Sequence, residues 1–233
     1  MSLDQTYALD VENSEPPGPT LATTVTGRLR TAIIVGEMAP GTKINIDRVR
    51  DQLGVSLSPL REALSRLFSE GFLTFQDNRG YRVAPVSEGD LLQISLLRVK
   101  LETLALRAAI ELGDAKWEEA ILRGLKELQA IRCDPKDARS VEAYELAHRN
   151  FHVELISACE MPLLLQFSHT LHSLYDRYRR IFLAAPHLAP DRMGEHIEMA
   201  TAAVERRKNE AVTLLKRHIE KTSAQILRVL PRP

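Results

Sequence analysis

Histidine is the residue type in this 233-residue sequence whose spacing most suggests chemistry. His148 and His152 are four residues apart, so on a helix their side chains would project from the same face. Two imidazoles on one helical face can chelate a divalent metal ion. His169 and His172 form a second pair, three residues apart, that is equally suited to this role. Spacing alone therefore offers two candidate metal-binding pairs and does not choose between them.

Two further histidines, His196 and His218, lie in helical patterns near the C-terminus. Ala200 follows His196 by one turn, and Leu214 and Leu215 precede His218 by one turn. Both imidazoles are therefore expected to face the interior of a helical bundle. A single inward-facing histidine is more often a hydrogen-bonded core residue than a metal ligand, so spacing does not assign these two residues a role.

The elements that must position these residues begin with two short helical patterns within residues 47–73. Val49 and Leu53 are apolar partners one turn apart, and Gly54 ends this first helix. Pro59 suits the first turn of the next helix, where no backbone N–H is needed. Two helices joined by so short a turn are typical of a helix-turn-helix.

A β-hairpin pattern follows the second helix. Residues 72–76 and 81–84 have the composition of strands, and the turn 77–80 contains Asp, Asn, Arg and Gly. Two strands after a helix-turn-helix form a wing, whose tip would carry Arg79 to a phosphate or into a minor groove. The sequence therefore predicts an N-terminal winged helix-turn-helix that binds DNA.

Six helical patterns fill the rest of the chain, with no convincing strand among them. Their connections are short, so we expect a C-terminal antiparallel bundle of about six helices and a mainly α fold. The expected bundle helices are 91–112, 117–132, 138–158, 162–184, 190–207 and 209–229, and another helix, 21–35, precedes the helix-turn-helix.

Composition divides the chain into four regions. Residues 1–19 hold four acids, three prolines and no base, and are expected to be a disordered tail. Residues 20–85, the expected DNA-binding domain, hold nine Lys/Arg against six Asp/Glu. This small basic surplus fits phosphate contact, although an ordinary mixed surface would look the same. Residues 86–90 are the expected linker, and residues 91–233 the expected all-helical domain.

Six short landmarks between residues 40 and 83 resemble, in order, the winged-helix domain of the GntR family of bacterial transcription regulators. Six matches in the same order make a chance similarity improbable. The landmarks are Pro40-Gly41, the Leu-Gly-Val-Ser of residues 53–56, the Pro-Leu-Arg-Glu-Ala-Leu of 59–64, the Glu-Gly-Phe-Leu of 70–73, Arg79-Gly80 and Val83.

The order of the later helices resembles the effector-binding domain of the FadR-type GntR regulators. A large branch of these domains binds a metal through an acid or similar ligand, a Phe-His, a Glu-His and a histidine on the last helix. This resemblance implies a divalent ion, zinc or nickel, with histidine replacing the usual acid at the first position. Four neutral ligands leave the charge of the ion uncompensated, which favours an anionic effector. The matching residues are His148, His152, His196 and His218.

The same resemblance places Arg98 in the effector pocket. The planar guanidinium of an arginine can hold a carboxylate through two donors. The alternative is an ion pair with Glu102, one turn later, which on a helix surface contributes only a few tenths of a kcal/mol.

By the same resemblance, the start of the second helix and the tip of the wing read DNA. The family usually has an arginine that reads a guanine at the position of Leu57, and leucine can touch only a thymine methyl. We therefore expect an operator that differs from the usual guanine-containing half-site. Arg50 and Arg66 are equally well explained as solvated surface residues. The expected DNA contacts are Arg48, Ser56, Leu57, Ser58, Arg61, Arg79 and Gly80.

These features together predict a homodimeric, one-component transcription regulator and not an enzyme. It would bind a pseudo-palindromic operator in double-stranded DNA as a repressor and respond to a small carboxylate metabolite, an organic or sugar acid. No apolar run approaches membrane-spanning length, and no charged segment precedes an apolar core, so we expect a cytoplasmic protein without membrane contact.

Three alternatives remain open at this stage. The first is a metal-dependent hydrolase, which would leave the DNA-binding domain unexplained. The second is a regulator whose metal is purely structural and whose effector is an acyl chain or another apolar molecule. The third is a redox sensor that uses Cys133 or Cys159, although reduced thiols are the default for two distant cysteines.

Overall fold

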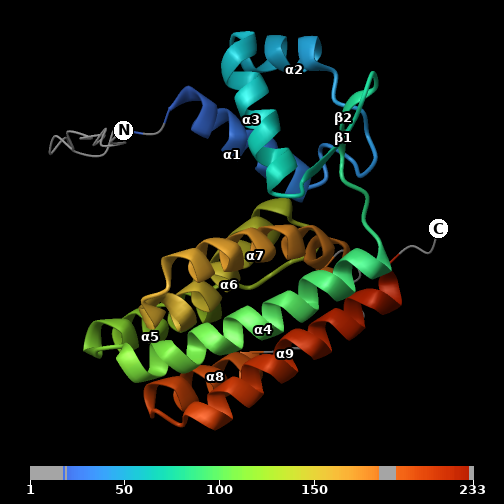
Figure 1. The fold of residues 1–233 in the computed structure, drawn as a ribbon. Helices are drawn as coiled ribbons and strands as arrows, with labels where there is room; N and C mark the ends of the chain where they lie inside the picture. The colour runs from blue at the N-terminus through green and yellow to red at the C-terminus, as the bar shows by residue number, and fades with distance from the viewer. Residues whose placement is uncertain (1–17, 19, 184–192, 231–233) are drawn as a thin grey trace, which may run out of the picture.

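The computed structural model describes residue 18, residues 20–183 and residues 193–230. It is mainly helical and has two parts: a small N-terminal part with one hairpin, lying against one face of a bundle of long helices (Figure 1). The predicted fold class, a winged helix-turn-helix followed by a helical bundle, is confirmed. The expectation for residues 1–19 concerns residues that, apart from Gly18, lie outside the described part of the chain.

The N-terminal part is a winged helix-turn-helix. Its elements follow the order α1 (Leu21–Ile34), α2 (Ile46–Leu53), α3 (Leu57–Ser69), β1 (Leu73–Gln76) and β2 (Gly80–Val83). The two strands pair in antiparallel register, and Gln76 lies opposite Gly80, so three residues form the tip of the wing.

Local sequence explains where α2 and α3 begin and end. The side chain of Asn45 accepts a hydrogen bond from the N–H of Arg48 at 3.0 Å and so caps α2. Gly54 follows with a φ of 64°, a left-handed conformation that glycine adopts at little cost, and the helix ends there. Ser56 takes the N-cap position of α3 without a hydrogen bond from its side chain to the cap.

The bundle helices match the expected order, with small shifts at their ends. Ser87 caps α4 by accepting a hydrogen bond from the N–H of Asp90 at 3.1 Å, so that helix begins inside the segment 86–90 expected to be a linker. The start of the helix expected at 190–207 lies partly outside the described residues. The helices are α4 (Glu88–Leu112), α5 (Ala115–Ala130), α6 (Ala138–Ile156), α7 (Pro162–Leu183), α8 (Met193–Val204) and α9 (Lys208–Val229), with a 3-10 turn, η1 (Ser157–Cys159), after α6.

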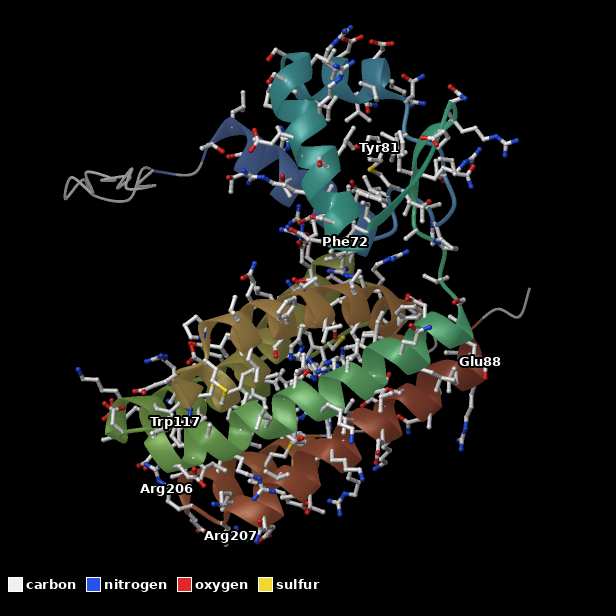
Figure 2. All side chains as sticks on the ribbon, viewed as in Figure 1. Phe72, Tyr81, Glu88, Trp117, Arg206 and Arg207 are labelled. Carbon is white, nitrogen blue, oxygen red and sulfur yellow. The ribbon has the colours of Figure 1, made fainter. Side chains whose placement is uncertain are left out.

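Helix α4 lies along both α7 and α9, and its apolar residues join the main core of the bundle. At the end of the bundle far from the winged helix, the Nε1–H of Trp117 donates to the carbonyl of Glu154 at 2.9 Å. The guanidinium of Arg206 lies over the Trp117 ring, 5.1 Å from its centroid (Figure 2). Gly113 leaves room for this ring, because a Cβ at that position would lie only 2.7 Å from the carbonyl oxygen of Ala109 and overlap the indole.

Candidate metal centre and DNA-binding surface

Four histidines from three helices meet inside the bundle. His148 and His152 come from α6, His196 from α8 and His218 from α9, and all four are buried. One ring nitrogen of each lies within 4.8 Å of those of the other three. The structure thus brings together the four residues that the sequence singled out as candidate metal ligands.

The spacing of these nitrogens suits a transition metal. The Nε2 atoms of His148 and His152 are 3.2 Å apart. Two nitrogens bound at about 2.0–2.1 Å to one tetrahedral zinc ion would lie about 3.3 Å apart. Imidazole nitrogen also suits nickel, whereas magnesium and calcium prefer oxygen ligands. The donor set therefore fits zinc or nickel.

The environment keeps the two imidazoles of α6 neutral. Burial holds the pKa of His148 and that of His152 well below the usual histidine value, and neighbouring positive or titratable groups act in the same direction. A neutral imidazole keeps the lone pair that a metal ion needs.

A carboxylate orients one of the four rings. Oε2 of Glu195 lies 2.8 Å from Nδ1 of His218, and Oε1 of the same carboxylate contacts the ammonium of Lys221. In the tautomer in which Nδ1 donates to Glu195, the lone pair of Nε2 remains available to a metal ion.

The two histidines of the second candidate pair, His169 and His172, lie in different environments. His169 is exposed, whereas His172 is buried beside the four-histidine cluster, with its ring centroid 5.8 Å from that of His152. The two side chains therefore do not meet as a chelating pair. Nε2 of His172 instead lies 3.2 Å from Oε2 of Glu102.

Arg98 forms the ion pair with Glu102 that the sequence offered as an alternative, but the pair is buried and not on the helix surface. Nε and Nη2 of Arg98 donate to the two carboxylate oxygens at 2.6 and 3.2 Å. The guanidinium also lies over the ring of Tyr175, 4.4 Å from its centroid. Burial alone would raise the pKa of Glu102, but Arg98 and His172 outweigh it and lower that pKa to about 2.

Two further ion pairs join α6 to α7 around the cluster. Asp176 on α7 contacts Arg149, the residue after His148. Arg179, one turn further along α7, holds Glu145, one turn before His148, at 2.9 and 2.7 Å. Sequence reasoning missed these four charged residues, because each partner comes from a different helix and no spacing rule connects them.

The expected DNA-contacting residues lie on α2, the start of α3 and the wing, at the end of the winged helix away from the bundle (Figure 1). Ser56, Leu57, Ser58 and Arg61 occupy the start of α3, and Arg48 is exposed on α2. Arg79 lies in the tip of the wing, next to Gly80 at the start of β2. Gly80 has a φ of 75° and Asn78 a φ of 61°, so this hairpin tip needs residues that tolerate a left-handed backbone.

The arginines of this surface differ in their intramolecular partners. Arg50 pairs with Asp47 and Asp51, and Arg66 pairs with Glu62 and donates to Thr23. Within the described residues, no ion pair joins Arg48, Arg61 or Arg79 to an acid. The three arginines that the sequence named as DNA contacts therefore have no acidic partner among the described residues.

The two cysteines do not form a disulfide bond. Cys159 is buried in the main core and Cys133 is half-buried, and both are free thiols. Burial raises the pKa of Cys133, with Glu145 acting in the same direction, so its thiolate is disfavoured. None of the described helices is long and apolar enough to cross a membrane.

A winged helix joined to a helical bundle with a buried cluster of ligand-type side chains defines a class of DNA-binding regulators that carry a sensor domain. Two family models match this chain, bacterial regulatory proteins of the gntR family over residues 21–83 and the FCD domain over residues 93–221. The chain belongs to the GntR family of transcription regulators, with an N-terminal GntR helix-turn-helix domain and a C-terminal FCD domain.

Curated relatives are described in the same terms. An uncharacterised HTH-type transcriptional regulator, BphR of Paraburkholderia xenovorans, is 34% identical over 83% of this chain and 80% of its own length. The HTH-type transcriptional repressor GlaR of Escherichia coli is 30% identical over 82% of this chain and 89% of its own. These relatives confirm the predicted regulator class, as opposed to an enzyme.

Solved structures share the fold. E. coli McbR/YncC superposes with a TM-score of 0.76 at 21% identity and covers 90% of this chain and 98% of its own. A GntR regulator from Rhodococcus sp. RHA1 gives a TM-score of 0.73 at 22% identity, over 90% and 99% of the two chains. At these identities the likeness supports the architecture alone.

Proposed function

We propose that this chain is a homodimeric repressor that binds a small organic or sugar acid at a metal ion held by His148, His152, His196 and His218. The observation that carries this proposal is the convergence of four buried imidazoles from three helices. A divalent ion there would supply a Lewis-acidic positive charge that attracts a carboxylate.

The surroundings of the cluster support an anionic effector. Burial keeps the imidazoles of His148 and His152 neutral, so these two ligands do not compensate the charge of a divalent ion. His172 links the cluster to Arg98, because its ring lies 5.8 Å from that of His152 and its Nε2 lies 3.4 Å from Nη2 of Arg98. An effector carboxylate would bind Arg98 by sharing or replacing Glu102, which now occupies two of its donors.

DNA binding in this proposal uses the outer surface of the winged helix. Arg61 would contact a base or phosphate from α3, and Arg48 and Arg79 would contact phosphates from α2 and the wing. Leu57 cannot make bidentate hydrogen bonds to guanine, so the half-site would differ from the family's usual one. Two winged helices in a dimer would bind two half-sites of a pseudo-palindrome on cytoplasmic DNA. The description of GlaR as a repressor supports this direction of control.

A thermal-shift screen of small carboxylates and sugar acids, on zinc-loaded and chelated protein in parallel, tests the sensor part. A ligand at a hundred times its dissociation constant should add about 2.7 kcal/mol of stability. The shift should require zinc and disappear in His152→Ala. The matched control is His169→Ala, which removes an exposed imidazole outside the cluster.

Two results would contradict the proposal. If chelation lowers the melting temperature and no acid changes it, the metal is structural, and acyl chains become the next ligands to screen. If acids stabilise chelated and zinc-loaded protein equally, the effector binds away from the histidines. The operator is tested separately: the same protein preparation selects the fragments it binds from random DNA, and their sequences show which half-sites it prefers.

A further inference from the structure

Helix α7 contacts both the metal-candidate helix α6 and α1 of the winged helix, which lies above it in Figure 1. Its second half contains five consecutive buried residues, 175–179. Successive residues of a helix point in directions about 100° apart, so a helix buried all round must have partners on every side. The partners of this segment belong to both parts of the molecule.

One face of this segment contacts α6. Asp176 and Arg179 are three residues apart and so share a face. They pair with Arg149 and Glu145, which lie directly after and one turn before His148. Any displacement of α6 around His148 therefore acts on α7 through one buried and one half-buried ion pair.

The other residues of this segment contact the chain that connects the winged helix to α4. Tyr178 accepts a hydrogen bond from the backbone N–H of Ser87 at 3.2 Å and donates to Asp90 at 2.6 Å. The guanidinium of Arg177 donates to the carbonyl of Ala84, the residue after β2. The N–H of Ala84 in turn donates to the carbonyl of Phe72 at 2.9 Å, at the base of the wing.

Apolar packing reinforces these hydrogen bonds. Leu174, one turn before Tyr178, packs against the core of the winged helix and also against the apolar cluster of α4, α7 and α9. Its methyl group lies 3.7 Å from the position that a Cβ would take on Gly71, which has a φ of 83° after α3. The winged helix thus contacts α7 through side chains and not only through the chain connection.

We propose that Arg177 and Tyr178 are positioning residues that fix the winged helix against α7 and transmit metal occupancy at α6 to the DNA-binding part. This inference rests on the proposed metal centre. Because residues 176–179 form one helical turn, a shift of Asp176 and Arg179 with α6 moves Arg177 and Tyr178 with it. Metal binding can change the DNA-binding part only if it favours one position of that turn over another.

Hydrogen exchange followed by mass spectrometry on the full chain tests this transmission, with zinc alone as the probe. Zinc should slow exchange in α6 around His148 and His152, and should also change exchange in residues 84–91, which contain the Ser87 amide. Tyr178→Phe removes both hydrogen bonds of the hydroxyl, including the one from the Ser87 amide. The response of residues 84–91 should therefore fall at least about two- to tenfold, the effect of losing one hydrogen bond, while α6 remains protected.

Two further variants make the result specific. Arg177→Gln removes the donor to Ala84 and should reduce the same response, which keeps the test decisive if one variant folds poorly. Tyr175→Phe is the matched control. Tyr175 lies on α7 like Tyr178, but its hydroxyl contacts Ser223 on α9 and not the connection to the winged helix. Tyr175→Phe should keep the wild-type response of residues 84–91.

Each remaining outcome has a defined meaning. Zinc protection of α6 without any response at residues 84–91 in the wild type would overturn the transmission alone. A wild-type response retained in both Tyr178→Phe and Arg177→Gln would overturn the role of these two residues. If zinc protects nothing in α6, the proposed metal centre fails, and the transmission of its occupancy fails with it.

Discussion

The guanidinium of Arg179 holds both carboxylate oxygens of Glu145, at 2.9 and 2.7 Å, inside the bundle one turn from His148. A buried pair of this kind gives little net stability over an apolar pair, but removing one partner leaves a buried charge uncompensated. The two ends of this ion pair therefore constrain α6 and α7 to each other.

We expect Arg179→Leu to destabilise the metal-free protein by about 3–5 kcal/mol, because Glu145 would remain buried without its cation. The double variant with Glu145→Leu should recover most of that loss. Urea unfolding followed by fluorescence measures both, since Trp117 is the only tryptophan in the sequence and lies in the bundle core. Equal losses in the single and double variants would contradict the buried-charge explanation.

Glu195→Gln should lower zinc affinity by about 10- to 100-fold, because the carboxylate orients His218 and increases the basicity of its ring. Competition with a chromogenic chelator measures this affinity. Glu198→Gln is the control: Glu198 lies on the same helix, is exposed and pairs with Arg217. The prediction is wrong if the two variants bind zinc equally well.

Acid should destabilise the bundle through Glu102. Its folded pKa of about 2 lies below the ordinary value of 4.5, so it contributes stability above pH 4.5 that is lost as the pH falls toward 2. That contribution is about 3 kcal/mol. Glu102→Gln should therefore be less stable than the wild type at pH 7, and the difference should shrink toward pH 2. Urea unfolding of metal-free protein across this range measures the effect, and a difference independent of pH would exclude it.

Replacing Leu57 should change which operator is bound. Leu57→Arg places a bidentate donor at the start of α3 and should favour guanine at one position of each half-site by about 1–3 kcal/mol. Selection from random DNA, performed on both proteins, reveals the change. Leu57→Gln should favour adenine at that position instead, and identical selected sequences for all three proteins would remove residue 57 from base readout.

Arg61 and Arg66 should differ in their effect on DNA affinity. Arg61→Ala should weaken binding and reduce its salt dependence by about one phosphate contact if the side chain meets the backbone, or relax one base preference if it meets a base. Arg66→Ala should leave both properties unchanged, because Arg66 already pairs with Glu62. Titrations at several salt concentrations compare them, and equal losses would contradict the assignment.

Much of the fold could be predicted because its signals are local. Gly54, Pro59 and the strand composition and turn residues of the hairpin each act within a few residues, and the elements they predict lie within one or two residues of the observed bounds. Helix ends were less certain: Ser87 starts α4 within the expected linker, because a side-chain cap was enough to extend it.

The candidate site could be predicted only in part. The spacing of His148 and His152 indicated a shared face, but His169 and His172 had the same quality of signal. Which face of α7 is buried could not be inferred, because residues 175–179 are buried whatever their polarity. The preference for His148 and His152 came from the family resemblance.

The charged residues around the histidines had no sequence signal at all. Glu145 and Arg179 are 34 positions apart, and nothing in either segment indicates that α6 and α7 lie side by side. Such pairs depend on how helices pack, which periodicity does not determine.

The position of Leu174 in two apolar clusters limits how freely this regulator can be recombined. A chimera that joins this bundle to another winged helix at residue 86 would keep Leu174, Arg177 and Tyr178 facing a foreign surface. Engineers who wish to retain the response to ligand should exchange the exposed reading residues of α3 within this winged helix, and leave Gly71, Phe72 and Ala84 in place.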